Sequence, residues 1–381
     1  MKKKLRIALF FSSDPSKAGG VQEHIYYLAK ELQLLGHTVS VFGPDKKNIR
    51  WNFPNYVPLC DIKKVTTPNG NVTNIALEYK NTENVVKDIE KSFDILHVHE
   101  PYIPFVSWKL LTSVDIPKVT TFHTAWNDDS IFSAVDTALS VFKKAFSRQV
   151  VAAIFVSELT QQRWKVVCNP TVLQRVIPHG VDKTFVPVTR KKTPPKVTLL
   201  FLARVVKRKG LQYLLKALSQ LEKNTLSSIE LTVVGNGDYL PSAKKLVKKL
   251  ALDDTVKFVG AVYGKDRISY YQQAALFCAP YADEAFGMTV LEAMACGATI
   301  VGFKNGGFKS MLDEYPYPEL LVPQQDVEAL SEALRKAVLD SSMRKKAGTW
   351  AVRKSQEFSW RDAAKETEKV YLESSAAYQK H

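Results

Sequence analysis

Two segments of the chain share one pattern: an apolar strand, a loop and an amphipathic helix, in that order. The first spans residues 5–35 and carries the pair Gly19-Gly20 in its loop. The second spans residues 197–221, and its helix has a leucine-rich face. A strand, loop and helix in this order open a parallel α/β nucleotide-binding fold. The chain is therefore predicted to be an α/β protein with two such domains.

The stretch at residues 189–196 separates the two segments. Its sequence, Thr-Arg-Lys-Lys-Thr-Pro-Pro-Lys, is polar, basic and proline-bearing, which is typical of a domain boundary. A length of 381 residues also suits two domains better than one core. We predict an N-terminal Rossmann-like domain at residues 1–188 and a C-terminal one at residues 195–357.

The chain is strongly basic, with a formal net charge of +15 and a pI near 9.4. Nucleic acid, an anionic membrane surface and phosphorylated substrates are the partners that such a charge attracts. No nucleic-acid-binding motif is present, and the lysines are spread over several segments. The composition therefore favours an anionic substrate or an anionic membrane surface over nucleic acid.

The cellular location is predicted from the absence of apolar spans and of cysteine patterns in the sequence. No apolar stretch approaches the length of a membrane span, and the basic start leads directly into a short strand. The four cysteines have neither paired nor metal-ligand spacing, which is typical of reduced thiols. We expect a cytoplasmic protein, peripheral on the inner face of the cell membrane.

Two glutamates lie eight residues apart across a predicted strand-to-helix junction. Residues 274–280 form a predicted buried strand and residues 288–295 a predicted helix, with Gly297 as its C-cap. Glu284 then lies on the loop and Glu292 about one turn into the helix. Eight helical residues rise roughly 12 Å, which is about the span of a nucleotide sugar. An ordinary surface helix would give the same spacing.

Groups suited to a diphosphate lie near these glutamates in the predicted fold. The backbone N–H groups of Gly287, Met288 and Thr289 begin the helix, and a helix N-terminus attracts phosphate. Arg204 and Lys209, at a strand end and a helix start, would add positive charge. No Asp-x-Asp motif stands where a metal would hold a diphosphate, so we expect a metal-free site.

Histidines end two predicted strands in the first half. His123 closes the strand at residues 118–123, where a neutral imidazole can hydrogen-bond a sugar hydroxyl. A lone histidine is more often structural, and we interpret His97 and His99 in that way. Residues 131–148 predict an amphipathic helix packed on the sheet; its phenylalanine and lysine faces would also suit an anionic bilayer.

These motifs together resemble the retaining GT-B glycosyltransferases of the E-x7-E type, family 4. In its motifs the chain is most similar to the phosphatidylinositol mannosyltransferases. The residues that carry this resemblance are Ala18-Gly-Gly-Val-Gln22, His97-Val-His-Glu-Pro101, Thr121-Phe-His-Thr124, Leu200-Phe-Leu and Glu284-x-Phe-Gly. The resemblance implies two Rossmann-like domains facing a central cleft, with the acceptor side in the first domain and the donor side in the second. It also implies that the last helix, residues 362–381, packs back on the first domain.

The resemblance assigns roles to individual residues, with no cofactor and no metal. Glu284 would orient the sugar and Glu292 would hold the ribose. The catalytic set is His123, Arg204, Lys209 and Glu284. The donor-binding set is Gly20, Gly235, Val262, Phe286, Gly287, Met288, Thr289 and Glu292. The acceptor-binding set is Gln22 and Asn69.

The implied reaction is retaining transfer of mannose or glucose from a nucleoside diphosphate sugar to a lipid hydroxyl, such as that of phosphatidylinositol or a glycolipid. A GDP-sugar is favoured over a UDP-sugar. Three departures keep other readings open: Asn74 stands where a basic residue would hold inositol phosphate, residues 82–87 are not polybasic, and Gly264 replaces an acid associated with guanine.

Three other functions therefore stay open. The first is a UDP-glucose-dependent diacylglycerol glucosyltransferase. The second is a nucleotide-sugar epimerase of the same fold, and the third is a non-catalytic binding subunit. An oxidoreductase is not favoured, because neither glycine loop reads Gly-x-Gly-x-x-Gly.

Overall fold

The computed structural model describes residues 3–66, 72–79, 82–103, 105–125, 146, 150–169, 171–188 and 195–379. The chain divides into two compact units. Unit 1 is Met1–Gly180 with Trp360–His381, and unit 2 is Val181–Ser359. Asn69, the linker at 189–194 and most of the predicted helix at 131–148 lie outside the described residues.

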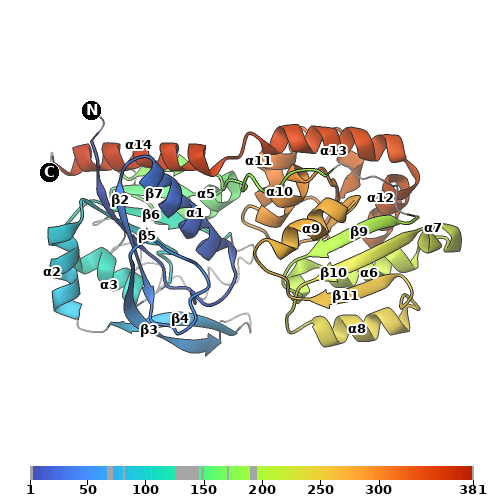
Figure 1. The fold of residues 1–381 in the computed structure, drawn as a ribbon, viewed down its shortest axis with the longest axis horizontal. Helices are drawn as coiled ribbons and strands as arrows, with labels where there is room; N and C mark the ends of the chain where they lie inside the picture. The colour runs from blue at the N-terminus through green and yellow to red at the C-terminus, as the bar shows by residue number, and fades with distance from the viewer. Residues whose placement is uncertain are drawn as a thin grey trace. The chain divides into compact units, whose positions relative to one another are not determined.

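Unit 1 is built on a largely parallel sheet with the strand order β4-β3-β2-β1-β5-β6-β7-β8 (Figure 1). Only the β3–β4 pair among these described strands is antiparallel. The strands are β1 Arg6–Phe10, β2 Thr38–Pro44, β3 Tyr56–Thr66, β4 Val72–Tyr79, β5 Ile95–His99, β6 Lys118–Phe122, β7 Ala152–Phe155 and β8 Leu173–Val176.

The central strands of unit 1 are buried on both faces, as parallel strands covered by helices are. Every residue of β5, β6 and β7 is buried. Phe10, Phe122, Phe155 and Trp164 belong to one buried hydrophobic core cluster. The helices of this unit are α1 Gly20–Leu34, α2 Thr82–Ser92, α3 Val106–Ser113, α5 Glu158–Trp164, the 3₁₀ turn η1 Lys165–Val167, and α14 Trp360–Tyr378.

The last helix, α14, packs in unit 1 although it ends the chain. Its Glu368 carboxylate lies 3.2 Å from the buried His37 Nε2, and its Tyr371 hydroxyl lies 2.6 Å from His97 Nδ1. Unit 2 begins at Val181, before the sequence-based limit at residue 188. The reason is local, because the Val181 amide donates to the Phe358 carbonyl oxygen at 3.0 Å within unit 2.

Unit 2 has a fully parallel sheet with the order β11-β10-β9-β12-β13-β14 among its described strands. Together with unit 1 it confirms the predicted α/β class. The strands are β9 Val197–Leu202, β10 Ile229–Val234, β11 Val256–Gly260, β12 Leu276–Ala279, β13 Thr299–Phe303 and β14 Leu321–Val322.

Helices flank the sheet of unit 2 (Figure 1). They are η2 Lys207–Lys209, α6 Leu211–Ser219, α7 Lys223–Ser227, α8 Leu240–Lys249, α9 Asp266–Gln273, α10 Met288–Ala295, η3 Gly306–Phe308, α11 Lys309–Leu312, η4 Pro318–Leu320, α12 Val327–Leu339 and α13 Ser341–Ser355. Across both units, no helix of the described ranges combines the length and the apolar character that crossing a membrane needs.

The strand order reverses once in each sheet, between β1 and β5 and between β9 and β12. Loops that leave the carboxyl ends of the strands diverge at such a reversal, and ligands of open α/β sheets bind there. The loops that follow β9 and β12 contain Lys209 and Glu284. The loops that follow β1 and β5 contain Asp14 and Glu100.

Gly210 shows how closely the two loops of unit 2 approach. It adopts the left-handed conformation at φ +73°, and a Cβ there would overlap the Pro280 carbonyl oxygen. Only glycine satisfies both demands. Gly264 has a similar φ of +59°, but a Cβ there would meet nothing within 4 Å.

This pair makes a matched test of packing against backbone strain. We expect Gly264→Ala to lower the free energy of unfolding by about 1 kcal/mol, because only the left-handed conformation is penalised. Gly210→Ala should cost at least about 3 kcal/mol, because the clash with Pro280 adds to that penalty. Urea unfolding monitored by circular dichroism measures both. Equal losses would contradict the close approach of the two loops.

Candidate functional site

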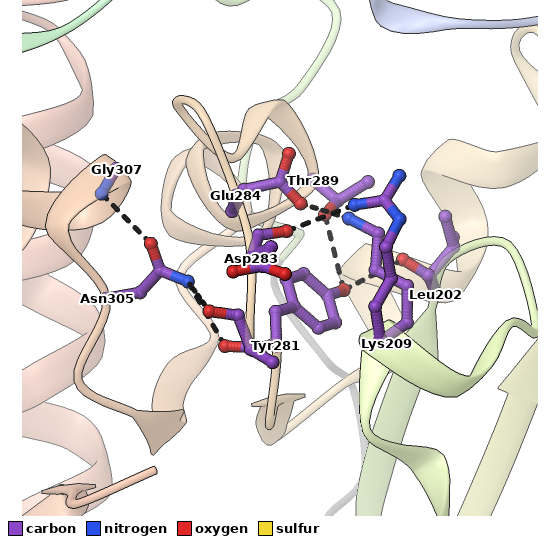
Figure 2. Close-up of polar contacts among 10 residues, drawn as sticks. Leu202, Lys209, Tyr281, Asp283, Glu284, Thr289, Asn305 and Gly307 are labelled. Carbon is purple, nitrogen blue, oxygen red and sulfur yellow. Dashed lines mark hydrogen bonds and ion pairs between the residues drawn. The ribbon is translucent and has the colours of Figure 1, made fainter. Parts of the chain in front are cut away.

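A buried ion pair joins the two loops at the strand-order reversal of unit 2. The Lys209 Nζ donates to Glu284 Oε2, and the side chains are 11% and 20% exposed (Figure 2). The same Nζ lies 4.3 Å from the centroid of the Tyr281 ring. Burial lowers the pKa of Lys209, and the Glu284 carboxylate acts against that shift. The site therefore holds a cation in a largely water-excluded setting.

The loop that carries Glu284 is held along its length by hydrogen bonds from neighbouring segments. The Asn305 amide donates to the carbonyl oxygens of Tyr281 and Ala282, at 3.1 Å each, and accepts from the Gly307 amide at 2.9 Å (Figure 2). Arg208 Nη1 donates to the Asp283 carbonyl oxygen at 3.1 Å. This loop is therefore preorganised, since its carbonyl groups are already paired.

The helix α10 starts immediately after this loop. Its N-cap is Gly287, at φ +93°, which has no side chain to satisfy the first amide groups. Met288 and Thr289 follow as the first helical residues, so their amides lie at the positive end of the helix dipole. Phe286 is buried and its ring centroid lies 6.0 Å from that of Phe358. This helix start is suited to an anion.

Arg204 belongs to the same electrostatic group. Its side chain is exposed after β9, and its charge interacts with those of Arg208, Glu284 and Asp238. Lys209 and Arg204 thus both interact electrostatically with Glu284, and their role at a diphosphate stays a prediction.

Glu292 is buried on α10 and already has two partners. Arg267 Nη2 donates to its Oε1 and the Tyr271 hydroxyl donates to its Oε2, both at 2.6 Å. Burial, and to a smaller extent the negative charge of Glu292, raises the pKa of Tyr271 well above its usual value. The phenol therefore stays protonated and donates its hydrogen bond to Glu292. A ribose that binds Glu292 would share or displace these bonds, and its role as a ribose ligand stays a prediction.

The remaining donor-side residues lie after two neighbouring strands. Gly235 follows β10 at φ +146°, and its amide donates to the Gly260 carbonyl oxygen at 2.7 Å. Val262 follows β11 and is half-buried. Both positions are on loops from the carboxyl edge of the sheet, as predicted, while their contacts with a ligand stay a prediction.

In unit 1, the predicted glycine loop leads into α1. Gly20 is the first helical residue and is exposed, whereas Gln22 is buried and its Nε2 donates to the Asp14 carbonyl oxygen at 2.9 Å. Gln22 therefore supports the loop after β1 directly, and its predicted contact with the acceptor stays a prediction. Glu100, at the other side of the strand-order reversal, accepts from Ser13 and from Tyr102, and burial raises its pKa.

Five histidines form one cluster in unit 1, which we call the histidine cluster: His24, His97, His99, His123 and His179. His99 Nδ1 lies 3.0 Å from His123 Nε2, and His24 Nδ1 lies 2.8 Å from His179 Nδ1. His97 is hydrogen-bonded at both nitrogens, to Thr121 and Tyr371, which agrees with a structural role. His99 instead contacts the predicted sugar ligand His123.

Burial keeps this cluster uncharged. It lowers the pKa of all five imidazoles, to about 3 for His97 and His179. Neighbouring histidines lower the pKa of His24, His99 and His123 further. Each ring therefore has one N–H and one lone pair near neutral pH.

Several of these groups were missed by sequence reasoning. His24 is one helical turn beyond Gly20, and the bond to His179 joins residues 155 positions apart. Arg267 and Tyr271 come from a helix that no motif marks. Tyr281 lies three residues before Glu284 and Asn305 lies after β13, and only the fold shows that they contact the Glu284 loop.

Solved structures with this fold define the class of protein. Anabaena HepE, in a complex with UDP and glucose, aligns with a TM-score of 0.77 at 18% identity, over 96% of this chain and 99% of that one. A sucrose-phosphate synthase from Thermosynechococcus elongatus aligns with a TM-score of 0.73 at 22% identity, over 98% and 100%. The two parallel-sheet units are thus those of the GT-B fold.

Sequence relatives then give the family. The family of glycosyl transferases group 1 matches residues 182–353, and Glycosyltransferase Family 4 matches residues 18–185. A phosphatidyl-myo-inositol mannosyltransferase of Mycolicibacterium smegmatis is 31% identical over 363 residues, covering 93% of this chain and 90% of the relative. The chain belongs to this family of glycosyltransferases, which confirms the resemblance found in the motifs.

The histidine cluster predicts an acid-labile unit 1. Because the folded-state pKa values lie below the unfolded value of about 6.5, the unfolded chain binds more protons below that pH, and stability falls as the pH falls. As the pH falls from 7.5 to 5.5, each of the five histidines should lower the free energy of unfolding by about 1.4 kcal/mol. Hydrogen exchange read by mass spectrometry should therefore show unit 1 opening first.

Unit 2 is the internal control for this prediction, since Val181–Ser359 contains no histidine. Its exchange should change much less over the same pH range. Parallel loss of protection in both units would contradict the account, and so would an unchanged unit 1.

Proposed function

We propose that this glycosyltransferase moves a hexose from a nucleoside diphosphate sugar to a hydroxyl group of a membrane lipid, with retention and without a metal ion. The observation that carries the proposal is the buried Lys209–Glu284 pair beside the uncapped start of α10. The name of the M. smegmatis relative supports a lipid acceptor and mannose. The UDP and glucose bound to HepE support a nucleotide-sugar donor.

On the donor side, residues 195–357 would bind the nucleotide sugar. Lys209 and Arg204, with the amides of Met288 and Thr289, would stabilise the diphosphate as negative charge develops on it. Glu284 would accept hydrogen bonds from sugar hydroxyls and orient the hexose. Its existing bond to Lys209 fixes the carboxylate for that task. The proposed donor set is completed by Gly235, Val262, Phe286, Gly287 and Glu292, and by Gly20 from the first domain.

On the acceptor side, residues 1–188 would present the lipid hydroxyl, with residues 362–381 attached to that domain. Gln22 and Asn69 are the proposed acceptor contacts. His123 would hydrogen-bond the hexose as a neutral imidazole, in agreement with its lowered pKa. The acceptor oxygen forms the new bond to the anomeric carbon as the bond to the diphosphate breaks, and its proton passes to a leaving diphosphate oxygen.

The donor base and sugar are the finer part of the proposal. GDP-mannose is our first choice, because two relatives of similar length carry mannosyltransferase names. UDP-glucose is the alternative. A thermal-shift panel of GDP, UDP and ADP with their sugars separates these, because a ligand that binds only the folded state raises its stability.

Replacing the Glu284 carboxylate tests the proposed function. Glu284→Gln keeps the shape but loses the charge, so we expect transfer to lipid vesicles to fall by about 100-fold in kcat. Glu332→Gln, an exposed glutamate on α12, is the matched control and should be silent. Product analysis by mass spectrometry with chelator present measures both. Full transfer by Glu284→Gln would refute the assigned role, and sugar conversion without acceptor would indicate an epimerase.

An anionic membrane surface is the proposed partner of a basic groove in unit 2. The groove, of about 440 Å³, runs between α6 and α8, and four lysines line it: Lys207, Lys216, Lys245 and Lys249. A lysine near an anionic bilayer contributes about 1 kcal/mol, so several together give useful affinity. The net charge of +15 agrees with such a partner.

Charge reversal tests this surface. The triple variant Lys216→Glu, Lys245→Glu, Lys249→Glu should bind phosphatidylcholine vesicles containing phosphatidylglycerol on the order of 100-fold more weakly. A control triple, Lys345→Glu, Lys346→Glu, Arg353→Glu on α13, changes the net charge equally. Co-sedimentation measures both proteins, with pure phosphatidylcholine as the lipid control. Equal weakening by the two triples would refute a specific membrane-binding role for the groove.

A further inference from the structure

Three ring nitrogens of the histidine cluster are buried without a hydrogen-bond partner in the described part of the chain. They are His24 Nε2, His99 Nε2 and His123 Nδ1. A buried polar group left unpaired costs about 1–3 kcal/mol, so native proteins rarely collect three of them in one place. The proposed transfer chemistry uses only His123. The other two rings need a different explanation.

The same three residues converge from separate elements. His24 is on α1, His99 ends β5 and His123 follows β6. Each offers one ring nitrogen, either Nδ1 or Nε2, and the three nitrogens chosen in this way lie within 4.8 Å of one another. Hydroxyl ligands of a hexose would be spread around a sugar ring, whereas nitrogens this close can all contact one atom. Neutral imidazoles, each with a lone pair, are ligands for transition-metal ions.

We propose that His24, His99 and His123 bind one divalent transition-metal ion, with zinc as the expected species. Three imidazoles and one open position form a known type of zinc site. Binding through the unpaired nitrogens would break the hydrogen bond between His99 Nδ1 and His123 Nε2, because both rings would then carry their proton on the nitrogens that face each other.

His179 would support the site from outside. Its Nδ1 lies 2.8 Å from His24 Nδ1, so it can fix the orientation of the His24 ring. Partners of this kind typically change metal affinity by about 10-fold to 100-fold without being ligands. His179 is therefore a positioning residue in this proposal.

The ion would regulate transfer, and this part rests on the proposed function of His123. A metal-bound His123 cannot offer the same nitrogen to a hexose hydroxyl, so metal binding and transfer would exclude each other. Zinc should inhibit, and a chelator should restore activity. This differs from a metal that holds the diphosphate, because a chelator would then abolish transfer.

Cobalt(II) titration of the full-length protein tests the site without any activity assay. We expect one equivalent of Co²⁺ to give the visible absorption of a tetrahedral nitrogen site, and zinc to displace it. His24→Asn, His99→Asn and His123→Asn should each weaken binding by more than about 100-fold, because each removes a direct ligand. His179→Asn should retain the spectrum, with affinity lower by about 10-fold.

The unmodified protein alone can overturn the proposal, so the test does not depend on any variant folding. No saturable tetrahedral spectrum would refute the site, and so would intense thiolate charge-transfer absorption, which would indicate the buried cysteines. Complete loss in His179→Asn would refute the three-residue assignment. Zinc that binds without inhibiting transfer would refute the regulation only. A protein that binds Co²⁺ but transfers no sugar even after the metal is removed by chelator would leave the site intact and refute the proposed function.

Discussion

The ion pair between Lys209 and Glu284 is the interaction on which the donor half of the molecule depends. It joins the loops that follow β9 and β12, where the strand order of unit 2 reverses. The two loops approach so closely that Gly210 has no room for a Cβ against Pro280. Gly307, in η3, likewise has no room for a Cβ against the Glu284 carbonyl oxygen. Close contacts between backbone segments therefore fix the position of the charged pair as much as side-chain contacts do.

Such a pair is a costly way to stabilise a fold. Desolvation of two buried charges often equals or exceeds their attraction, so well-packed apolar residues would serve stability as well. Its value is positional, since the cation lies beside the N-terminus of α10 before any ligand arrives. Preorganised charge of this kind stabilises a transition state without reorganisation. The histidine cluster is the corresponding feature of unit 1. Burial keeps its five imidazoles neutral, and the cluster lies near the reversal of strand order between β1 and β5.

Much of this architecture could be predicted because it is local in sequence. The helix predicted at 288–295 has the same bounds in the structure, and the strands predicted at the start of 197–221 and at 274–280 are present as β9 and β12, since uninterrupted apolar runs mark buried parallel strands. Lys209 and Glu284 could be selected because each follows such a strand. The family resemblance supplied the roles, and the residues themselves supplied only their positions.

What could not be predicted depends on long-range contact. The hydrogen bond between His24 and His179 joins residues 155 positions apart, and no periodic pattern in the sequence predicts it. Arg267 and Tyr271 pair with Glu292 from a helix of ordinary composition. The β3–β4 hairpin went unpredicted because its strands mix charged and apolar residues, as a sheet edge permits.

The proposed function requires that this chain transfer a hexosyl group from a nucleotide sugar to a lipid with retention. NMR of the product made from a donor labelled with ¹³C at the anomeric carbon tests it most directly, with chelator present throughout. The account predicts a glycolipid whose anomeric configuration matches the donor, formed together with one nucleoside diphosphate per lipid. An inverted anomeric centre, or hexose released to water with no lipid product, would contradict it.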